Sequence, residues 1–235
     1  NFVLQKDPND VNARIAKAVI LSTAGLKRQD EAASLFESVL NDYPGNSRAG
    51  LGFISLLRSQ GKITEAIQLA EVFLRNNPKD YVLMINLGDL YLRVEESQKA
   101  IGLYEQALSM TPRSPQAMNN LAYAYAAAGQ QLDKALELSQ KALDILPADS
   151  SFLDTLGFVY LKKGDTTRAI EVFSAALESA REPEASHIRY HLALGHFENG
   201  SPELAKKELE VAMASDESIR PMAEKLLTTI QNSER

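Results

Sequence analysis

The sequence predicts an all-α protein built as a solenoid of stacked helical hairpins. Three features predict it: a repeat period near 34 residues, apolar stripes with helical spacing inside each period, and a proline close to the end of most periods. An alanine marks the period at intervals of 34, 34, 35, 34 and 36 residues, at Ala32, Ala66, Ala100, Ala135, Ala169 and Ala205.

Within one period, two helices are predicted on either side of a polar break. In the third period, Leu87 and Tyr91 precede the break at residues 94–98, and Ala100 and Tyr104 follow it. Small residues beside the tyrosines let two helices approach closely, as in ridges-into-grooves packing. The proline ends the second helix, because it lacks an N–H group and disfavours helical geometry in the residue before it.

Six full repeats are predicted, at residues 11–46, 47–80, 81–114, 115–149, 150–185 and 186–219. The first has two extra residues in its turn, and the fourth has one, at Gln130 or Gln131. The second departs furthest from the pattern, with Gly50 and Ile54 where a large and a small residue are expected.

Both ends of the chain are expected to flank the six repeats with partial elements. Residues 1–10 are expected to be the end of the second helix of a preceding, truncated repeat. Residues 220–235 are expected to form a capping helix and tail, with Met222, Leu226 and Leu227 on its apolar face.

This frame resembles the tetratricopeptide repeat (TPR) family, whose pattern is Leu-Gly, Tyr, Ala, an aromatic residue, Ala and Pro across 34 residues. The resemblance covers nearly the whole chain. It implies an α-solenoid, a right-handed superhelix of antiparallel helix pairs that serves as a non-catalytic scaffold for protein partners. The lysines and asparagines of the carboxylate clamp of chaperone-binding TPR domains are absent, which disfavours capture of a chaperone C-terminus.

A concave groove is predicted to bind a protein or peptide partner. Positions 4, 7, 8 and 11 of each first helix are expected to face neighbouring helices, so positions 2, 5, 6, 9, 12 and 13 face the groove. Exposed aromatic residues favour a partner site, because rigid rings bury much area at small entropic cost. The alternative is that these rings pack between adjacent first helices or under the cap. The predicted groove residues are Asn86, Asp89, Arg93, Asn119, Asn120, Tyr123, Asp154, Phe158, Tyr190, His191 and Phe197.

Composition and motifs argue against other classes of function. The net charge of −6 and the lack of a Lys/Arg run disfavour nucleic acid, and no stretch is apolar enough to insert directly into a membrane. The histidines His187, His191 and His196 lack an acidic or thiol partner that would complete a metal site. No phosphate loop or catalytic constellation is found, so neither a cofactor nor enzymatic activity is expected.

A finer resemblance concerns residues 117–165 and 188–213, which look like the C-terminal repeats of bacterial TPR proteins linked to exopolysaccharide (biofilm) production and exosortase systems. It implies a scaffold in the bacterial periplasm, within a membrane-associated complex and tethered by segments outside these residues, with the cytoplasm as the alternative compartment. The alternative function is self-assembly, as a homo-oligomer or as the oligomerisation module of a multiprotein complex.

Overall fold

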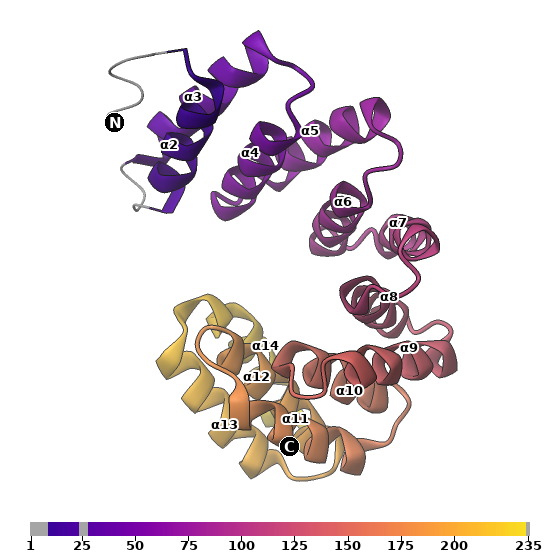
Figure 1. Ribbon diagram of the computed structural model, residues 1–235. Helices are drawn as coiled ribbons and strands as arrows, with labels where there is room; N and C mark the ends of the chain where they lie inside the picture. The colour runs from indigo at the N-terminus through magenta and orange to yellow at the C-terminus, as the bar shows by residue number, and fades with distance from the viewer. Residues whose placement is uncertain (1–8, 24–27, 234–235) are drawn as a thin grey trace. The chain divides into compact units, whose positions relative to one another are not determined.

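The computed structural model describes residues 9–23 and 28–233. Over these residues it contains thirteen α-helices and no strand, which confirms the predicted all-α class. Successive helices pack as adjacent pairs (Figure 1). The expected helix end at residues 1–10 falls largely outside the described residues.

Twelve of the helices form six pairs that follow the chain in order, and the thirteenth, α14, closes the series. They are α2 (Val11–Thr23) with α3 (Gln29–Asp42), α4 (Ser47–Ser59) with α5 (Ile63–Asn76), α6 (Tyr81–Arg93) with α7 (Ser97–Met110), α8 (Pro115–Ala127) with α9 (Leu132–Ile145), α10 (Ser150–Lys162) with α11 (Thr166–Ser179), and α12 (Glu184–Glu198) with α13 (Pro202–Ser215), followed by η2 (Glu217–Ile219) and α14 (Arg220–Ser233). The chain divides between Met110 and Thr111 into two compact units, an N-terminal unit with α2 to α7 and a C-terminal unit with α8 to α14.

Polar residues two positions after each repeat proline start the first helix of five pairs. Asn46, for example, accepts a hydrogen bond from the Ala49 backbone N–H at 3.0 Å, and Ser114 accepts one from the Ala117 N–H at 3.2 Å. Such N-caps each stabilise a helix by about 1 kcal/mol. The capping residues are Asp10, Asn46, Asp80, Ser114 and Asp149.

The sixth pair starts differently. Pro183 stands at the N-cap position of α12 and forms no side-chain cap, while Glu182 Oε2 accepts from the Ser186 N–H at 3.2 Å. Helix α12 begins at Glu184, two residues before the predicted boundary at residue 186.

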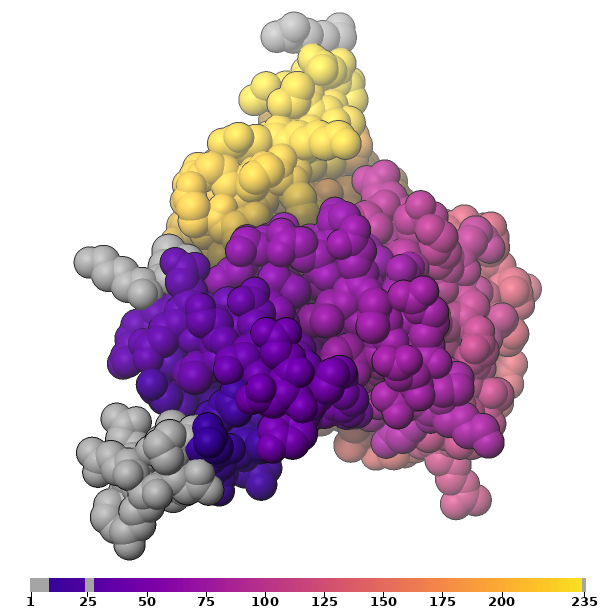
Figure 2. All heavy atoms as spheres, turned by 90° about the horizontal axis from the view of Figure 1, so that it is seen from above, coloured from indigo at the N-terminus to yellow at the C-terminus, as the bar shows by residue number. Residues whose placement is uncertain are grey.

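The repeat alanines lie where the two helices of a pair cross, and all six are fully buried. Opposite them, a small residue on the first helix meets a ring from the second. A Cβ atom added to Gly88 would lie 2.6 Å from the Tyr104 ring, and one added to Gly157 would lie 2.6 Å from the Phe173 ring. Glycine is therefore required at these crossings by space. In Figure 2 the N-terminal unit, drawn from indigo to magenta, presents a closely packed surface.

The second repeat keeps this packing by exchanging its large and small residues between the two helices. Phe73 on α5 stands where four other repeats have alanine and the first has Val39, and a Cβ on Gly50 would lie 2.6 Å from the Phe73 ring. Conversely, Ile54 on α4 stands where other repeats have glycine or alanine, with Ala70 on α5 at the position of Tyr104. Ile54 is 2% exposed and Ala70 is fully buried. The departure at Gly50 and Ile54 is thus a volume-conserving swap.

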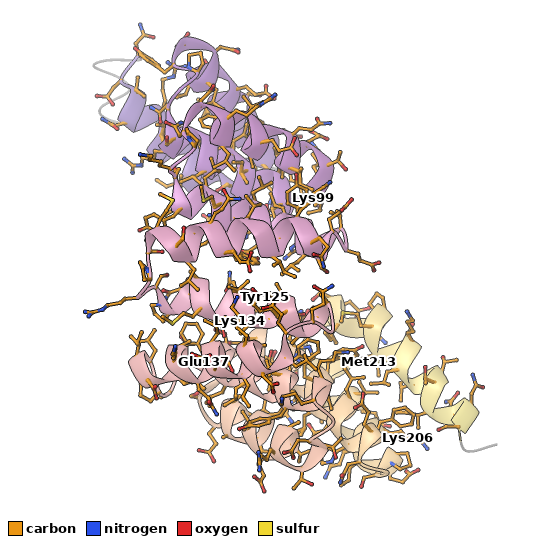
Figure 3. The ribbon with its side chains drawn as sticks, turned by 90° about the vertical axis from the view of Figure 1, so that its right-hand side faces the viewer. Lys99, Tyr125, Lys134, Glu137, Lys206 and Met213 are labelled. Atoms are coloured by element: carbon orange, nitrogen blue, oxygen red, sulfur yellow. The ribbon has the colours of Figure 1, made fainter. Side chains whose placement is uncertain are left out.

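A cation covers the repeat tyrosine in three consecutive repeats. Lys134 Nζ lies 5.1 Å from the centre of the Tyr125 ring and donates to the Tyr125 hydroxyl at 2.9 Å (Figure 3). The other two pairs are Lys99 over Tyr91 at 5.1 Å and Arg168 over Tyr160 at 5.6 Å. These contacts couple the first helix of a pair to the start of the second.

The turn between paired helices contains a residue with left-handed backbone geometry. Glycine holds this position in four repeats, with φ between 64° and 80°, at Gly61, Gly129, Gly164 and Gly200. Glu95 holds it in the third repeat, with φ of 61°. In the fourth repeat the turn also contains Gln131, with φ of 45°, at one of the two places predicted for the inserted residue.

Helix α14 covers the apolar end of the C-terminal unit. Ala223, Leu226 and Ile230 are buried against α12 and α13, and Leu227 packs on the edge of the same cluster. Met222 is 44% exposed, so its predicted place on the apolar face is wrong. The buried stripe runs instead through Ala223, which places Met222 on the outer side of the helix.

Candidate partner-binding site

In the N-terminal unit, the predicted groove residues on α6 are largely engaged by the protein itself. Asn86 Nδ2 donates to the Val82 carbonyl of the same helix at 2.8 Å. Asp89 accepts a hydrogen bond from the buried Tyr104 hydroxyl at 2.6 Å, which ties α6 to α7. Arg93 is exposed at the end of α6. The structure therefore gives Asn86 and Asp89 internal partners and leaves Arg93 at the surface.

In the C-terminal unit, four of the predicted residues form a continuous group that we call the aromatic row. It consists of Tyr123 on α8, Phe158 on α10, and Tyr190 and His191 on α12. The Tyr123 and Phe158 rings stack with centres 5.1 Å apart and planes at 25°. His191 lies tilted against Phe158, with ring centres 5.2 Å apart, and Tyr190 lies against His191 at 5.9 Å.

A hydrogen-bonding contact between two first helices holds the aromatic row in place. His191 Nδ1 lies 2.8 Å and 3.0 Å from the two carboxylate oxygens of Asp154 on α10. The side chains of Asp154 and His191 are 17% and 13% exposed. Because the partners come from consecutive repeats, this contact sets the spacing of α10 and α12 at the row.

Asn119 contributes a buried acceptor beside the row. It lies one helical turn before Tyr123 on α8 and is only 7% exposed. Its side-chain carbonyl oxygen, Oδ1, is one of two buried side-chain polar atoms that have no hydrogen-bond partner within the described residues. An acceptor of this kind costs about 1–3 kcal/mol when it is left unpaired. Its neighbour Asn120 is half-buried on the same helix.

The two tyrosines of the row stay neutral. Burial raises the pKa of Tyr123, with further contributions from the Asp154 carboxylate and from Tyr190. Burial likewise raises the pKa of Tyr190. Both hydroxyl groups can therefore donate and accept hydrogen bonds over the whole physiological pH range.

Not every predicted groove residue belongs to the aromatic row. Two residues that contact the row were not predicted from the sequence. Phe197 packs in the cluster under α14, and the rings of Tyr123 and Phe158 pack between the adjacent first helices α8 and α10, both as the alternative interpretation expected. Phe173, on the second helix α11, reaches His191 with ring centres 5.8 Å apart. Lys162 Nζ lies 5.2 Å from the centre of the Phe158 ring. Lys162 lies four residues after Phe158 on the same helix, and this spacing could have predicted the contact.

Neither a metal-ligand cluster nor a membrane-spanning helix occurs among the described residues. Residues 9–23 and 28–233 contain no group of three or more His, Cys, Asp or Glu side chains that could hold a metal ion. His187 is engaged at its Nδ1 by the Pro183 carbonyl at 3.2 Å, and His196 has a pKa lowered by burial. Within the described residues, the helices are too short or too polar to cross a bilayer.

Comparison with protein families identifies the repeat. The tetratricopeptide repeat family matches residues 25–81, 85–150 and 155–217, well over half of the chain. The chain is a tetratricopeptide repeat protein. TPR proteins generally mediate protein–protein interactions, and the TPR fold is generally a non-catalytic scaffold.

Curated relatives match only part of the TPR chain. The photosystem I assembly protein Ycf3 of Cyanophora paradoxa is 32% identical over 77 residues, which are 32% of this chain and 44% of that protein. The chain therefore spans less than half of the length of this relative.

Solved structures share the fold over nearly the whole TPR array. A tetratricopeptide repeat protein from Parabacteroides merdae ATCC 43184 superposes with a TM-score of 0.77 at 17% sequence identity. The match covers 97% of this chain and 88% of that chain. A chain of the APC/C hetero-tetramer Cut9-Hcn1 superposes with a TM-score of 0.78 at 19% sequence identity. The match covers 98% of this chain and 44% of that chain. These likenesses confirm the TPR solenoid.

Proposed function

We propose that this protein is a non-catalytic scaffold that binds a segment of a partner protein along α8, α10 and α12 of its C-terminal unit. The observation that carries the proposal is the unpaired Asn119 Oδ1 beside the half-buried Tyr123 of the aromatic row. A buried acceptor without a partner is rare in folded proteins, and a bound segment with an N–H group would satisfy it once the Asn119 side chain turns toward the surface.

The surroundings of this acceptor suit a polypeptide. Tyr123 and Tyr190 combine an apolar ring with a neutral hydroxyl, which is the composition typical of protein interfaces. The stacked rings and the Asp154–His191 contact hold the surface in place before binding, which lowers the entropic cost of association.

Selection from a library of short random peptides by the immobilised full chain tests the proposal. The tightest peptide is then measured against Tyr123→Leu, which keeps apolar bulk but removes the ring and hydroxyl. We expect its affinity to fall at least about tenfold, the loss typical of a residue at the centre of an interface. Leu204→Ala is the matched control, because Leu204 is 49% exposed on α13, outside the proposed surface.

Equal binding of the selected peptide by wild type and Tyr123→Leu would refute the proposed surface, provided that both proteins show the same helicity. Phe158 is unsuitable for this comparison. It is only 8% exposed, and its truncation would cost about 3–5 kcal/mol of stability.

At the level of the pathway, we propose a role in bacterial exopolysaccharide export, in the periplasm. The support is the resemblance of residues 117–165 and 188–213 to TPR proteins of that kind. Deletion of the gene should lower the exopolysaccharide yield of the source bacterium, and complementation with Tyr123→Leu should restore it less than wild type does. Unchanged yield on deletion would exclude this role and leave the binding surface untouched.

A further inference from the structure

Hydrogen-bond acceptors occupy equivalent positions on the three first helices of the C-terminal unit. Asn119, Asp154 and Tyr190 each lie two residues before the repeat leucine of their helix. One turn further on, Tyr123 and Phe158 also occupy equivalent positions, and their rings are in stacking contact. Asn119 and Asp154 therefore face the same strip of surface on adjacent helices.

Two of these acceptors have unused hydrogen-bonding capacity, although Asn119 is only 7% exposed. Asn119 Oδ1 has no partner within residues 9–23 and 28–233. The Asp154 carboxylate receives His191 Nδ1 at 2.8 Å and 3.0 Å, and a carboxylate has about four lone-pair sites in all. A ligand group for this strip must therefore donate several hydrogen bonds.

The charge of the strip is set by Asp154. Helix α8 contains no charged residue, and α10 contains only Asp154 and Lys162. On α12, Arg189 is paired with Glu208 at 2.7 Å, while Glu184 and Glu198 stand at the two ends of the helix. The carboxylate is thus the central charge of the row, in a chain whose net charge is −6.

We propose that this strip binds a lysine or arginine side chain of the partner protein. The cationic group would donate to Asp154, and to Asn119 Oδ1 once that buried side chain turns toward the surface, and its aliphatic stem would lie along the rings of Tyr123 and Tyr190. This inference rests on the proposed function, because it names the chemistry of the partner that the same surface takes.

Lys162 shows that an ammonium group can lie against this row. Its Nζ is 5.2 Å from the centre of the Phe158 ring, on an exposed side chain. Lys162 lies two helical turns after Asp154 on α10, so it repels an approaching cation over a distance that salt partly screens. Its removal should therefore favour a basic ligand.

The experiment compares charged and neutral versions of one peptide. Peptides are selected from the random library by the full chain and chosen for loss of binding to Tyr123→Leu. In the tightest one, each lysine is then replaced by norleucine and each arginine by citrulline, which keep most of the stem and remove the charge. Affinities are measured by fluorescence polarisation for wild type, Asp154→Asn and Lys162→Gln. Asparagine can still accept from His191 Nδ1, so Asp154→Asn is expected to keep the fold.

We expect wild type to bind the basic peptide at least about tenfold more tightly than its neutral version, as a charge-assisted hydrogen bond predicts. Asp154→Asn should bind the two peptides alike. Lys162→Gln should bind the basic peptide about twofold to threefold more tightly than wild type does, and the neutral peptide equally well.

Two results would overturn the inference. If the selected peptides contain no lysine or arginine, or if wild type binds the charged and neutral versions equally, the surface binds a partner of other chemistry and the proposed function stands. If no selected peptide depends on Tyr123, both the inference and the proposed function fail.

Discussion

At the scale of single residues, the unpaired side-chain carbonyl of Asn119 is expected to lower the stability of the free protein while it contributes to partner binding. Leucine has nearly the shape of asparagine, so Asn119→Leu removes the unsatisfied acceptor without leaving a cavity. We expect the free energy of unfolding to rise by about 1–2 kcal/mol, because the desolvation cost of the carbonyl disappears. Urea denaturation followed by circular dichroism measures this change.

The same substitution should weaken binding of the selected basic peptide, because the acceptor for its cationic group is gone. Asn119→Asp serves as the comparison, since it keeps an acceptor and adds a charge that favours a cation. A lower stability for Asn119→Leu would mean that the side chain has a structural role that the contacts do not reveal.

Sequence alone identified the members of the aromatic row but not their contacts. The repeat frame placed Tyr123 and Phe158 at equivalent positions, and equivalent positions on neighbouring helices come into contact. The Asp154–His191 contact joins non-equivalent positions of two repeats, so the frame gave no reason to pair them. Nor does a periodic pattern reveal that Asn119 Oδ1 lacks a partner, because that depends on every neighbouring atom.

At the scale of helices and turns, the pattern of small and large residues was predictable, but its exchange between helices was not. The sequence indicated close crossings at Gly88 and Gly157, and the rings of Tyr104 and Phe173 fill them. In the second repeat, Gly50 and Ile54 depart from the pattern of the first helix, and the residues that compensate for them lie on the second helix. The total volume at the crossing is what packing constrains, and Phe73 restores it from the other helix.

The sequence predicted the turns only as polar breaks, although their glycines recur at the same position of the repeat. Glycine is favoured there because other residues with left-handed geometry cost about 1 kcal/mol. Four turns have glycine at this position, and the third repeat has Glu95 with φ of 61°. The recurrence of glycine at this position in aligned repeats could have predicted the left-handed residue of each turn.

We therefore expect Glu95→Gly to stabilise the N-terminal unit by about 0.5–1 kcal/mol, because glycine adopts this geometry without strain. Gly61→Ala is the matched control in the same unit. Gly61 has φ of 73° and open space around it, so the alanine should destabilise by a similar amount through backbone strain alone. Thermal and urea unfolding of both variants measure the effect, and a destabilised Glu95→Gly would show that the Glu95 side chain makes a stabilising contact.

At the scale of the whole molecule, each unit is an array in which a helix pair is stabilised mainly by its neighbours. The final pair, α12 and α13, has a neighbour pair on one side and α14 on the other. Tyr190 of the aromatic row packs at the edge of the cluster that α14 covers. The cap therefore links the stability of the C-terminal unit to the geometry of the proposed binding surface.

Deletion of residues 220–235 should uncover the apolar faces of Ala193, Ala205 and Leu209, which are fully buried in the intact chain. We expect a loss of several kcal/mol in the unfolding free energy of the C-terminal unit, increased binding of a hydrophobic dye, and weaker binding of the selected peptide. Met222→Ser is the control within the same helix, because Met222 is 44% exposed and outside the cluster. If the truncated protein matched wild type in stability while the peptide still bound, α14 would be an appendage, and the packing of Leu226 and Ile230 would contribute nothing to the array.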